Sequence, residues 1–376
     1  MGWDGVSLMT RGFYRAGAAN AARIVGRLVR GIPVLAVCLV CGTEAAASPP
    51  GPAAATRVCQ TQRLMGVPWT ITVYAASEAV GDAAIAAGFA EVARLEQILS
   101  DYDPRSELSR LSAAAPTAAP KPVSDDLWRV LERAVEIRDA TDGAFDPTVG
   151  PLTSLWRQAR RSGRLPLAGK LAAAREAVGR ETLRLAPDTR GVVLTQPAMR
   201  LDLGGIGMGY AVDRAVEVLN RHGMTSAMVD ASGDIAVTAA PPGTSGWRIA
   251  VAPLGPAGTG TAPGDTAEPL LLTHAAVTTS GDAFQAVEID GRRYSHIVDP
   301  RTGLGVAGPA AVTVVAPDCT TADALATAAS VLGPEQATHV IAGLPGCAAR
   351  FVRQGDGQTH VSKTLRWPSQ APQSPR

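Results

Sequence analysis

The chain is predicted to adopt an α+β fold, in which mixed and largely antiparallel sheets are flanked by helices. Two observations favour this class: β-prone segments follow one another as hairpins, and helical segments lie between them without strict strand–helix alternation. The 376 residues are enough to bury a substantial core. The net charge is +1 and the sequence has no stripe dense in Lys and Arg, so nucleic acid is not an expected partner.

The N-terminal segment, residues 1–47, is predicted to be a signal peptide that directs export. An arginine-rich stretch precedes the apolar run 32–41, and the small residues up to Ala47 fit the cleavage preference of signal peptidase. The run covers about ten residues, whereas a membrane-spanning helix needs roughly 20, so cleavage is favoured over a retained anchor. Lipid attachment at Cys38 or Cys41 is a weaker alternative, because a bulky valine precedes each cysteine.

After cleavage, three parts are expected. Residues 48–60 form a linker rich in Pro and Ala, residues 61–365 form the folded domain, and residues 366–376 form a polar tail expected to be disordered. Three cysteines stay in the mature chain and allow at most one disulfide: Cys59, Cys319 and Cys347.

The domain is expected to begin with a pair of strands within 61–74, where β-prone residues alternate with polar ones. Ser77 is a suitable N-cap for a long helix that ends at Leu99, because apolar residues recur there at helical spacing. Ser124 caps a second helix, which ends in the turn-forming loop 142–147.

The middle of the domain is less regular. Residues 157–190, rich in Arg and Ala, are predicted to be a short helix and exposed loop. Residues 192–194 and 200–203 are predicted strands, and the second leads into the Gly-rich turn 204–209. Residues 210–220 then form a helix with apolar residues on its inner side.

The last part of the domain is dominated by predicted strands, with one helix that includes 321–327 and a surface insertion at 253–268. The strands are expected at 227–230, 232–237, 247–251, 277–282, 286–289 and 312–315.

The Gly-rich turn carries a first chemical signal. Backbone N–H groups of Gly204, Gly207 and Gly209 at the start of a helix could face a phosphate, but glycines at such turns equally often serve only the geometry. Asp202 lies just before this turn, and Asp146 lies in the 142–147 loop. Each is either a turn-stabilising carboxylate or an acceptor for a ligand hydrogen bond.

Asp323 and Thr327 form a sharper pair, since residues at i and i+4 share one helical face. The Ala-rich helix around them predicts close packing, and a carboxylate buried there needs a partner. A cation such as Mg²⁺, which prefers hard oxygen ligands, meets that need. His296 precedes a rigid Asp-Pro-Arg-Thr-Gly turn at 299–303, and this setting suits a positioned base better than a structural histidine.

Seven segments, taken in order between about Leu64 and Leu332, resemble the ApbE family of FAD:protein FMN transferases. They are Met65-Gly66, 99–109, 143–152, 202–213, 279–282, the His296 segment and 322–327. The resemblance implies an ApbE-like fold and a periplasmic, Mg²⁺-dependent enzyme. Such an enzyme moves FMN from FAD onto a threonine hydroxyl of an acceptor flavoprotein subunit and releases AMP. The acceptor would be the route to any association with the inner membrane.

The resemblance also implies roles for individual residues. His296 would be the base that takes the threonine proton. Mg²⁺ would be held by the Gly205 carbonyl, Asp323 and Thr327. The implied FAD contacts are Met65, Tyr102, Ala144, Phe145, Asp146, Asp202, Met208 and Ile297.

Two positions depart from the family pattern. Met208 stands where the family commonly has Lys or Glu, and Ser232 replaces the first glycine of a Gly-Gly pair. The alternatives are an FAD pyrophosphatase that releases FMN and AMP, and a flavin-binding protein without turnover. The same residues serve all three, so an assay with a threonine-bearing acceptor must separate them.

Overall fold

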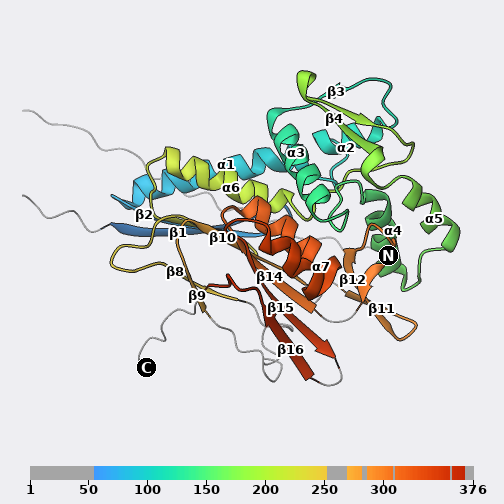
Figure 1. Ribbon diagram of the computed structural model, residues 1–376. Coiled ribbons are helices and arrows are strands. Elements are labelled where there is room, and N and C mark those ends of the chain that lie inside the picture. The colour runs from blue at the N-terminus through green and yellow to red at the C-terminus, as the bar shows by residue number, and fades with distance from the viewer. Residues whose placement is uncertain (1–54, 252–268, 282–285, 308–309, 356–357, 369–376) are drawn as a thin grey trace, which may run out of the picture. The chain divides into compact units, whose positions relative to one another are not determined.

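The computed structural model describes residues 55–251, 269–281, 286–307, 310–355 and 358–368 (Figure 1). The predicted signal peptide, the 253–268 insertion and most of the predicted tail lie outside these residues. The predicted linker 48–60 is wrong at its end, because the first strand already begins at Thr56. Residues 56–60 pair with the next strand and Val58 is buried in the main core, so they belong to the folded domain.

An eight-stranded sheet forms the centre of the domain, and each neighbouring pair of its strands is antiparallel. This confirms the predicted α+β class. In spatial order the strands are β1 (Thr56–Leu64), β2 (Val67–Ala75), β6 (Ala227–Ala231), β7 (Asp234–Val237), β10 (Ala275–Gly281), β14 (Ala310–Ala316), β15 (Ala348–Gly355) and β16 (Gln358–Lys363).

Three helices cover one face of this sheet: α1 (Glu78–Leu99), α6 (Gly207–Arg221) and α7 (Cys319–Ala342) (Figure 1). The main core lies between them and the strands, and its largest side chains include Trp69 and Ile85. As predicted, Ser77 caps α1, its hydroxyl accepting a hydrogen bond from the Val80 amide at 3.4 Å. Helix α7 kinks at Gly333, beyond the turns that carry the predicted metal ligands.

The opposite face of the sheet is covered by a hairpin of β8 (Trp247–Ala250) and β9 (Pro269–Leu272). Trp247 packs edge-on against Tyr74, with ring centroids 5.9 Å apart, and Val277 lies in the same apolar cluster. The sheet is therefore buried on both faces in this region.

The remaining α-helices and strands lie at one end of the sheet (Figure 1). They are α2 (Glu107–Ala113), β3 (Lys121–Pro122), α3 (Asp125–Ala140), α4 (Gly150–Ser162), α5 (Ala168–Glu176), β4 (Leu183–Ala186), β5 (Gly191–Leu194), β11 (Ala286–Ile289), β12 (Arg292–Val298) and β13 (Gly305–Ala307). Trp156 of α4 packs on Tyr294 of β12 and donates a hydrogen bond from Nε1 to the Gly303 carbonyl at 2.8 Å. This contact fixes α4 against the strand that carries His296.

Some predicted elements differ from the structure. Within 157–190, the predicted short helix is confirmed by α5 and by the second half of α4, whereas strand β4 was not predicted. Residues 200–203 are not a strand: only one bridge, between Arg200 and Val149, is formed there. The cysteines of the described residues are all free thiols, so no disulfide forms among Cys59, Cys319 and Cys347. Within the described ranges, no helix has the length and apolar character needed to cross a membrane.

Candidate functional site

A cavity of about 620 Å³ lies where α1 ends, beside α4, β12, the turn before α6, and α7. Eleven of the twelve predicted site residues line it: Met65, Tyr102, Ala144, Phe145, Asp146, Asp202, Gly205, Met208, His296, Ile297 and Thr327. The exception is Asp323, which is buried one helical turn before Thr327. Residues spread over more than 260 positions of sequence therefore meet around one space.

Gly205 and Thr327 touch closely at the wall of the cavity. A Cβ atom on Gly205 would lie 2.7 Å from the Thr327 hydroxyl, so only glycine lets the backbone approach the hydroxyl here. Asp323 Oδ2 accepts a hydrogen bond from the Gly209 amide at 3.2 Å. Gly205 and Thr327 are thus in close contact, and Asp323 lies one helical turn before Thr327 and is hydrogen-bonded to the first turn of α6.

The charge of this region favours a bound cation. Burial raises the pKa of Asp323 well above its ordinary value, and the nearby carboxylate of Asp234 adds to the rise. Burial likewise raises the pKa of Asp234 to about 7. Two buried acids that repel one another are relieved by a positive charge between or beside them. The donor set of one carboxylate, one hydroxyl and one backbone carbonyl fits Mg²⁺, which takes oxygen ligands.

A metal centre built on side-chain acids and histidines alone is not formed. In the described ranges, no group of three or more His, Cys, Asp or Glu residues is placed to hold a metal ion. A cation in this region would therefore depend on the Thr327 hydroxyl and the Gly205 carbonyl in addition to Asp323.

The glycines of the 204–209 turn serve geometry rather than phosphate binding. Their amides are used within the protein: Gly204 donates to Asp202 Oδ1 at 2.8 Å, Gly207 to the Leu203 carbonyl at 2.7 Å, and Gly209 to Asp323. A Cβ on Gly209 would come within 2.3 Å of the Cys319 carbonyl. Of the two interpretations left open by the sequence, the structure favours geometry, because these three amides are already paired and Gly209 lets α6 approach α7 closely.

His296 lies on β12 and lines the cavity half-buried, whereas the other four histidines of the chain are exposed. The strand ends in the predicted turn, closed by the Gly303 amide donating to the Asp299 carbonyl at 2.8 Å. Asp299 Oδ1 also accepts from the Arg301 amide at 2.9 Å. The turn and the Trp156 contact together hold the strand of His296 in place.

The two aspartates proposed as FAD contacts are turn-stabilising and cavity-lining at once. Asp146 Oδ1 accepts from the Thr148 amide at 2.8 Å and from its hydroxyl at 2.6 Å, and burial raises the pKa of Asp146. Asp202 Oδ2 accepts from the Thr153 hydroxyl at 2.6 Å. The two interpretations of these residues from sequence are therefore compatible.

The comparison with known proteins decides the family. The model of the ApbE family matches residues 65–351. The chain belongs to the ApbE family. An FAD:protein FMN transferase of Klebsiella pneumoniae (strain 342) is 29% identical over 344 residues, covering 89% of this chain and 95% of the relative. An FAD:protein FMN transferase of Treponema pallidum (strain Nichols) is 32% identical over 336 residues, covering 84% and 89%.

Solved structures of ApbE proteins have the same fold. The flavin transferase ApbE from Vibrio cholerae aligns with a TM-score of 0.73 at 28% identity, covering 83% of this chain and 98% of that structure. The apo form of the Pseudomonas stutzeri flavinyl transferase ApbE aligns with a TM-score of 0.71 at 29% identity, covering 83% and 96%. The ApbE resemblance inferred from seven segments is confirmed.

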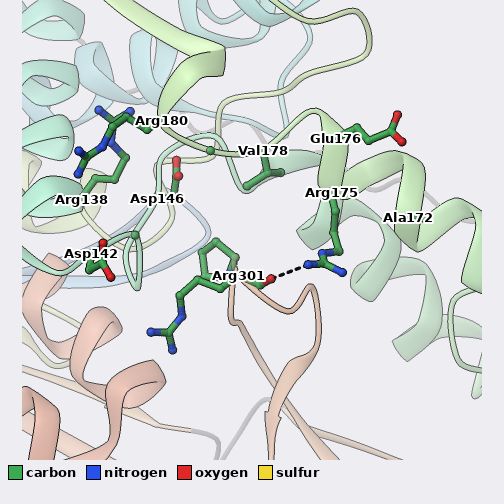
Figure 2. A pocket seen from close by; sticks show the side chains of 12 residues that line it. Arg138, Asp142, Asp146, Ala172, Arg175, Glu176, Val178, Arg180 and Arg301 are labelled. Atoms are coloured by element: carbon green, nitrogen blue, oxygen red, sulfur yellow. Dashed lines mark hydrogen bonds between the residues drawn. The ribbon is translucent and has the colours of Figure 1, made fainter.

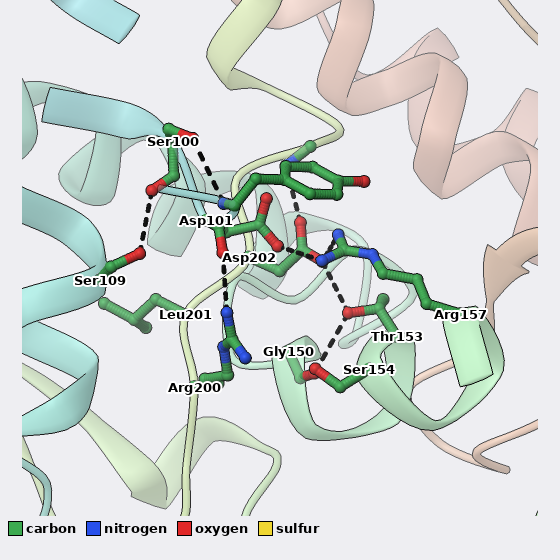
Figure 3. Close-up of polar contacts among 12 residues, drawn as sticks. Ser100, Asp101, Ser109, Gly150, Thr153, Ser154, Arg157, Arg200, Leu201 and Asp202 are labelled. Carbon is green, nitrogen blue, oxygen red and sulfur yellow. Dashed lines mark hydrogen bonds and ion pairs between the residues drawn. The ribbon is translucent and has the colours of Figure 1, made fainter. Parts of the chain in front are cut away.

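Several polar residues of the site were not predicted from the sequence of this ApbE chain. Figure 3 shows Arg157 of α4 lying between Asp101 and Asp202 at the cavity wall. The helical spacing of buried Leu152 and Trp156 predicts α4, but it places Arg157 about 100° away from Trp156 around the helix, so it does not signal that Arg157 faces the cavity.

Asp234 was also missed as a partner of Asp323. It follows a turn in which Ser232 has φ 59°, the left-handed region that favours glycine. This backbone conformation is consistent with the glycine that the resemblance implies at this position.

A second pocket of about 570 Å³ lies next to the first, and Asp146 and Pro300 line both (Figure 2). Its arginines are largely engaged within the protein: Arg138 and Arg180 pair with Asp139, Arg301 pairs with Asp299, and Arg175 donates to the Arg301 carbonyl. Acidic residues also line this pocket, among them Asp142 and Glu176. No function is assigned to it.

Proposed function

We propose that this ApbE chain is an Mg²⁺-dependent FAD:protein FMN transferase, which moves FMN from FAD onto a threonine hydroxyl of an acceptor flavoprotein and releases AMP. The observation that carries the proposal is that His296, Gly205 and Thr327 line one cavity, with Asp323 one helical turn before Thr327. A base and an oxygen-rich cation site at one cavity match the needs of phosphoryl transfer, and the relatives named above have this activity.

The flavin donor is a substrate that must be held along the cavity. Tyr102 and Phe145 offer aromatic rings, and Asp146 and Asp202 offer carboxylate oxygens, among the residues that line the cavity. Met208 contributes apolar surface and no charge. These contacts would orient the flavin so that the diphosphate lies near Gly205 and Thr327.

The remaining residues of the site would prepare the diphosphate for attack. Gly205, Asp323 and Thr327 would hold Mg²⁺, and the bound ion would supply charge neutralisation for the diphosphate oxygens. Asp323 contributes the negative charge of the ligand set and is fixed by the Gly209 amide. Because this carboxylate is buried, its orientation is set before substrate arrives.

His296 would take the proton of the acceptor hydroxyl. The threonine oxygen attacks the phosphorus of the FMN half, a new P–O bond forms, and the bond between that phosphorus and the bridging oxygen breaks. AMP leaves with the bridging oxygen and its electron pair. A positioned base contributes roughly 10²–10⁴ to the rate of such a step.

We also propose that the protein acts after export to the periplasm, which rests on the sequence of residues 1–47. Cell fractionation with N-terminal sequencing of the mature protein tests this. Cleavage near Ala47 and recovery from the periplasmic fraction support it, whereas an uncleaved cytoplasmic protein contradicts it.

The activity itself is tested by incubating the mature protein with FAD, Mg²⁺ and an acceptor peptide that has a single threonine. The proposal predicts an FMN mass gain on the peptide, formation of AMP, and no gain when threonine is replaced by alanine or when the metal is chelated. Release of free FMN and AMP without a mass gain would instead establish a pyrophosphatase. Unchanged FAD would establish a binding protein without turnover.

A further inference from the structure

We propose that Arg157 is a positioning residue for flavin binding, which holds Tyr102 and the carboxylates of Asp101 and Asp202 in one arrangement. The inference rests on the proposed function, since it concerns how the same cavity accepts FAD. It deepens that function by assigning a role to a side chain of α4, which supplies none of the predicted site residues.

The guanidinium of Arg157 bridges two carboxylates that come from separate loops. Nη1 donates to Asp101 and Nη2 donates to Asp202 Oδ2 at 3.0 Å, and the side chain of Arg157 is only 20% exposed (Figure 3). Arg200 approaches from the other side and donates to the Asp101 carbonyl at 2.7 Å. A planar fork suits this bridge better than the point charge of lysine, because its donors reach two acceptors at once.

The same guanidinium lies against the ring of Tyr102, with Cζ 4.3 Å from the ring centroid. Tyr102 is nevertheless 75% exposed and lines the cavity. One face of the ring is therefore supported by Arg157, while most of its surface remains open. An exposed aromatic ring with a supported back is prepared to stack on a planar ligand, and the flavin is such a ligand.

The position of Arg157 is itself fixed by its neighbours. The preceding residue, Trp156, is buried between α4 and β12, and Thr153, one turn earlier, shares Asp202 Oδ2 with Arg157. Loss of the guanidinium would leave Asp101 and Asp202 facing one another without the intervening cation, and Tyr102 without its support. Both effects weaken FAD binding and act before the chemical step.

The test compares Arg157→Met, Arg157→Lys and Arg161→Met, the last being the same substitution at an exposed position of α4. FAD binding is followed by flavin fluorescence, and transfer by steady-state kinetics. We expect Arg157→Met to raise the Kd and KM for FAD by about tenfold or more with a smaller change in kcat. Arg157→Lys should recover part of the affinity, and Arg161→Met should match the wild type.

A double-mutant cycle with Tyr102→Ala separates positioning from a general structural role. If Arg157 acts largely through the ring, Arg157→Met should weaken binding much less in the Tyr102→Ala background than in the wild type. Wild-type affinity in Arg157→Met, or fully additive effects, would overturn the inference while leaving the transferase assignment intact. Failure of the wild type to bind FAD would instead overturn the proposed function, and the inference with it. If Arg157→Met fails to fold, Arg157→Lys decides by the same criteria.

Discussion

Replacing Gly205 with alanine tests the metal site by geometry alone, because alanine keeps the backbone carbonyl that would bind Mg²⁺. The added Cβ would lie 2.7 Å from the Thr327 hydroxyl and 3.2 Å from the Thr327 Cβ. Since the Thr327 Cβ is itself too close, rotation of the side chain does not remove the clash. The hydroxyl must retreat by about 0.7 Å to reach an ordinary contact of 3.4 Å.

The expected cost has two parts. Overpacking of this kind lowers the free energy of unfolding by about 1–3 kcal/mol. Mg²⁺ requires near-ideal distances of about 2.0–2.1 Å, so a displaced hydroxyl should also weaken Mg²⁺ binding, by roughly tenfold or more. Thermal unfolding of the variant, recorded across a series of Mg²⁺ concentrations, measures both effects.

Gly207→Ala is the matched control, since its new Cβ would meet its nearest neighbour, Leu203, at an ordinary 3.5 Å. We expect its Mg²⁺ response to equal that of the wild type. A Gly205→Ala protein with the melting temperature and Mg²⁺ midpoint of the wild type would refute the close contact between Gly205 and Thr327.

Three further predictions follow from the site and its charges. Asp323→Asn should fold, because its amide oxygen still accepts from the Gly209 amide, but should lose the Mg²⁺-dependent rise in stability, which for the wild type is about 2.7 kcal/mol at 100 times the Kd; an unchanged rise in a thermal melt would exclude Asp323 as a ligand. His296→Ala should bind FAD within about threefold of the wild type and transfer FMN roughly 10²–10⁴ times more slowly, measured by peptide mass; a normal rate would place the base elsewhere. Burial raises the pKa of Asp213 from an ordinary 3.8 to about 6, so the unfolded chain loses this proton first as the pH rises. The Asp213 contribution to stability should therefore fall by about 3 kcal/mol between about pH 4 and 6 and stay constant above, and Asp213→Asn should lack this fall. Urea unfolding of both proteins across that range checks the difference, and parallel curves would count against the raised pKa.

Local signals in the sequence were sufficient for much of the fold. Ser77 and Ser124 cap the helices they were expected to cap, because a hydroxyl acceptor before an apolar helical period is a local property. The β1–β2 pair was also expected, because the alternation of β-prone and polar residues is likewise a local property. What local patterns did not give is the order of the eight strands, which depends on pairing between distant segments.

The site, too, was predicted from the sequence only in part. The ApbE segments led to eleven residues that line the cavity, although no local rule predicts that Met65 and Thr327 meet. Arg157 was missed because an arginine in a polar stretch is usually exposed, and only packing of α4 on β12 turns it inward. The role of the 204–209 amides stayed open at the sequence level, because the sequence does not show how closely α7 approaches this turn.

The central claim is that a divalent cation held by Gly205, Asp323 and Thr327 lies beside the diphosphate of FAD. The most direct measurement is a crystal structure of the protein with FAD and Mn²⁺ in place of Mg²⁺, in which anomalous scattering locates the ion. We predict one peak coordinated by the Gly205 carbonyl, the Asp323 carboxylate, the Thr327 hydroxyl and diphosphate oxygens. A bound FAD whose diphosphate lies away from these residues, or an ion coordinated elsewhere, would contradict the claim.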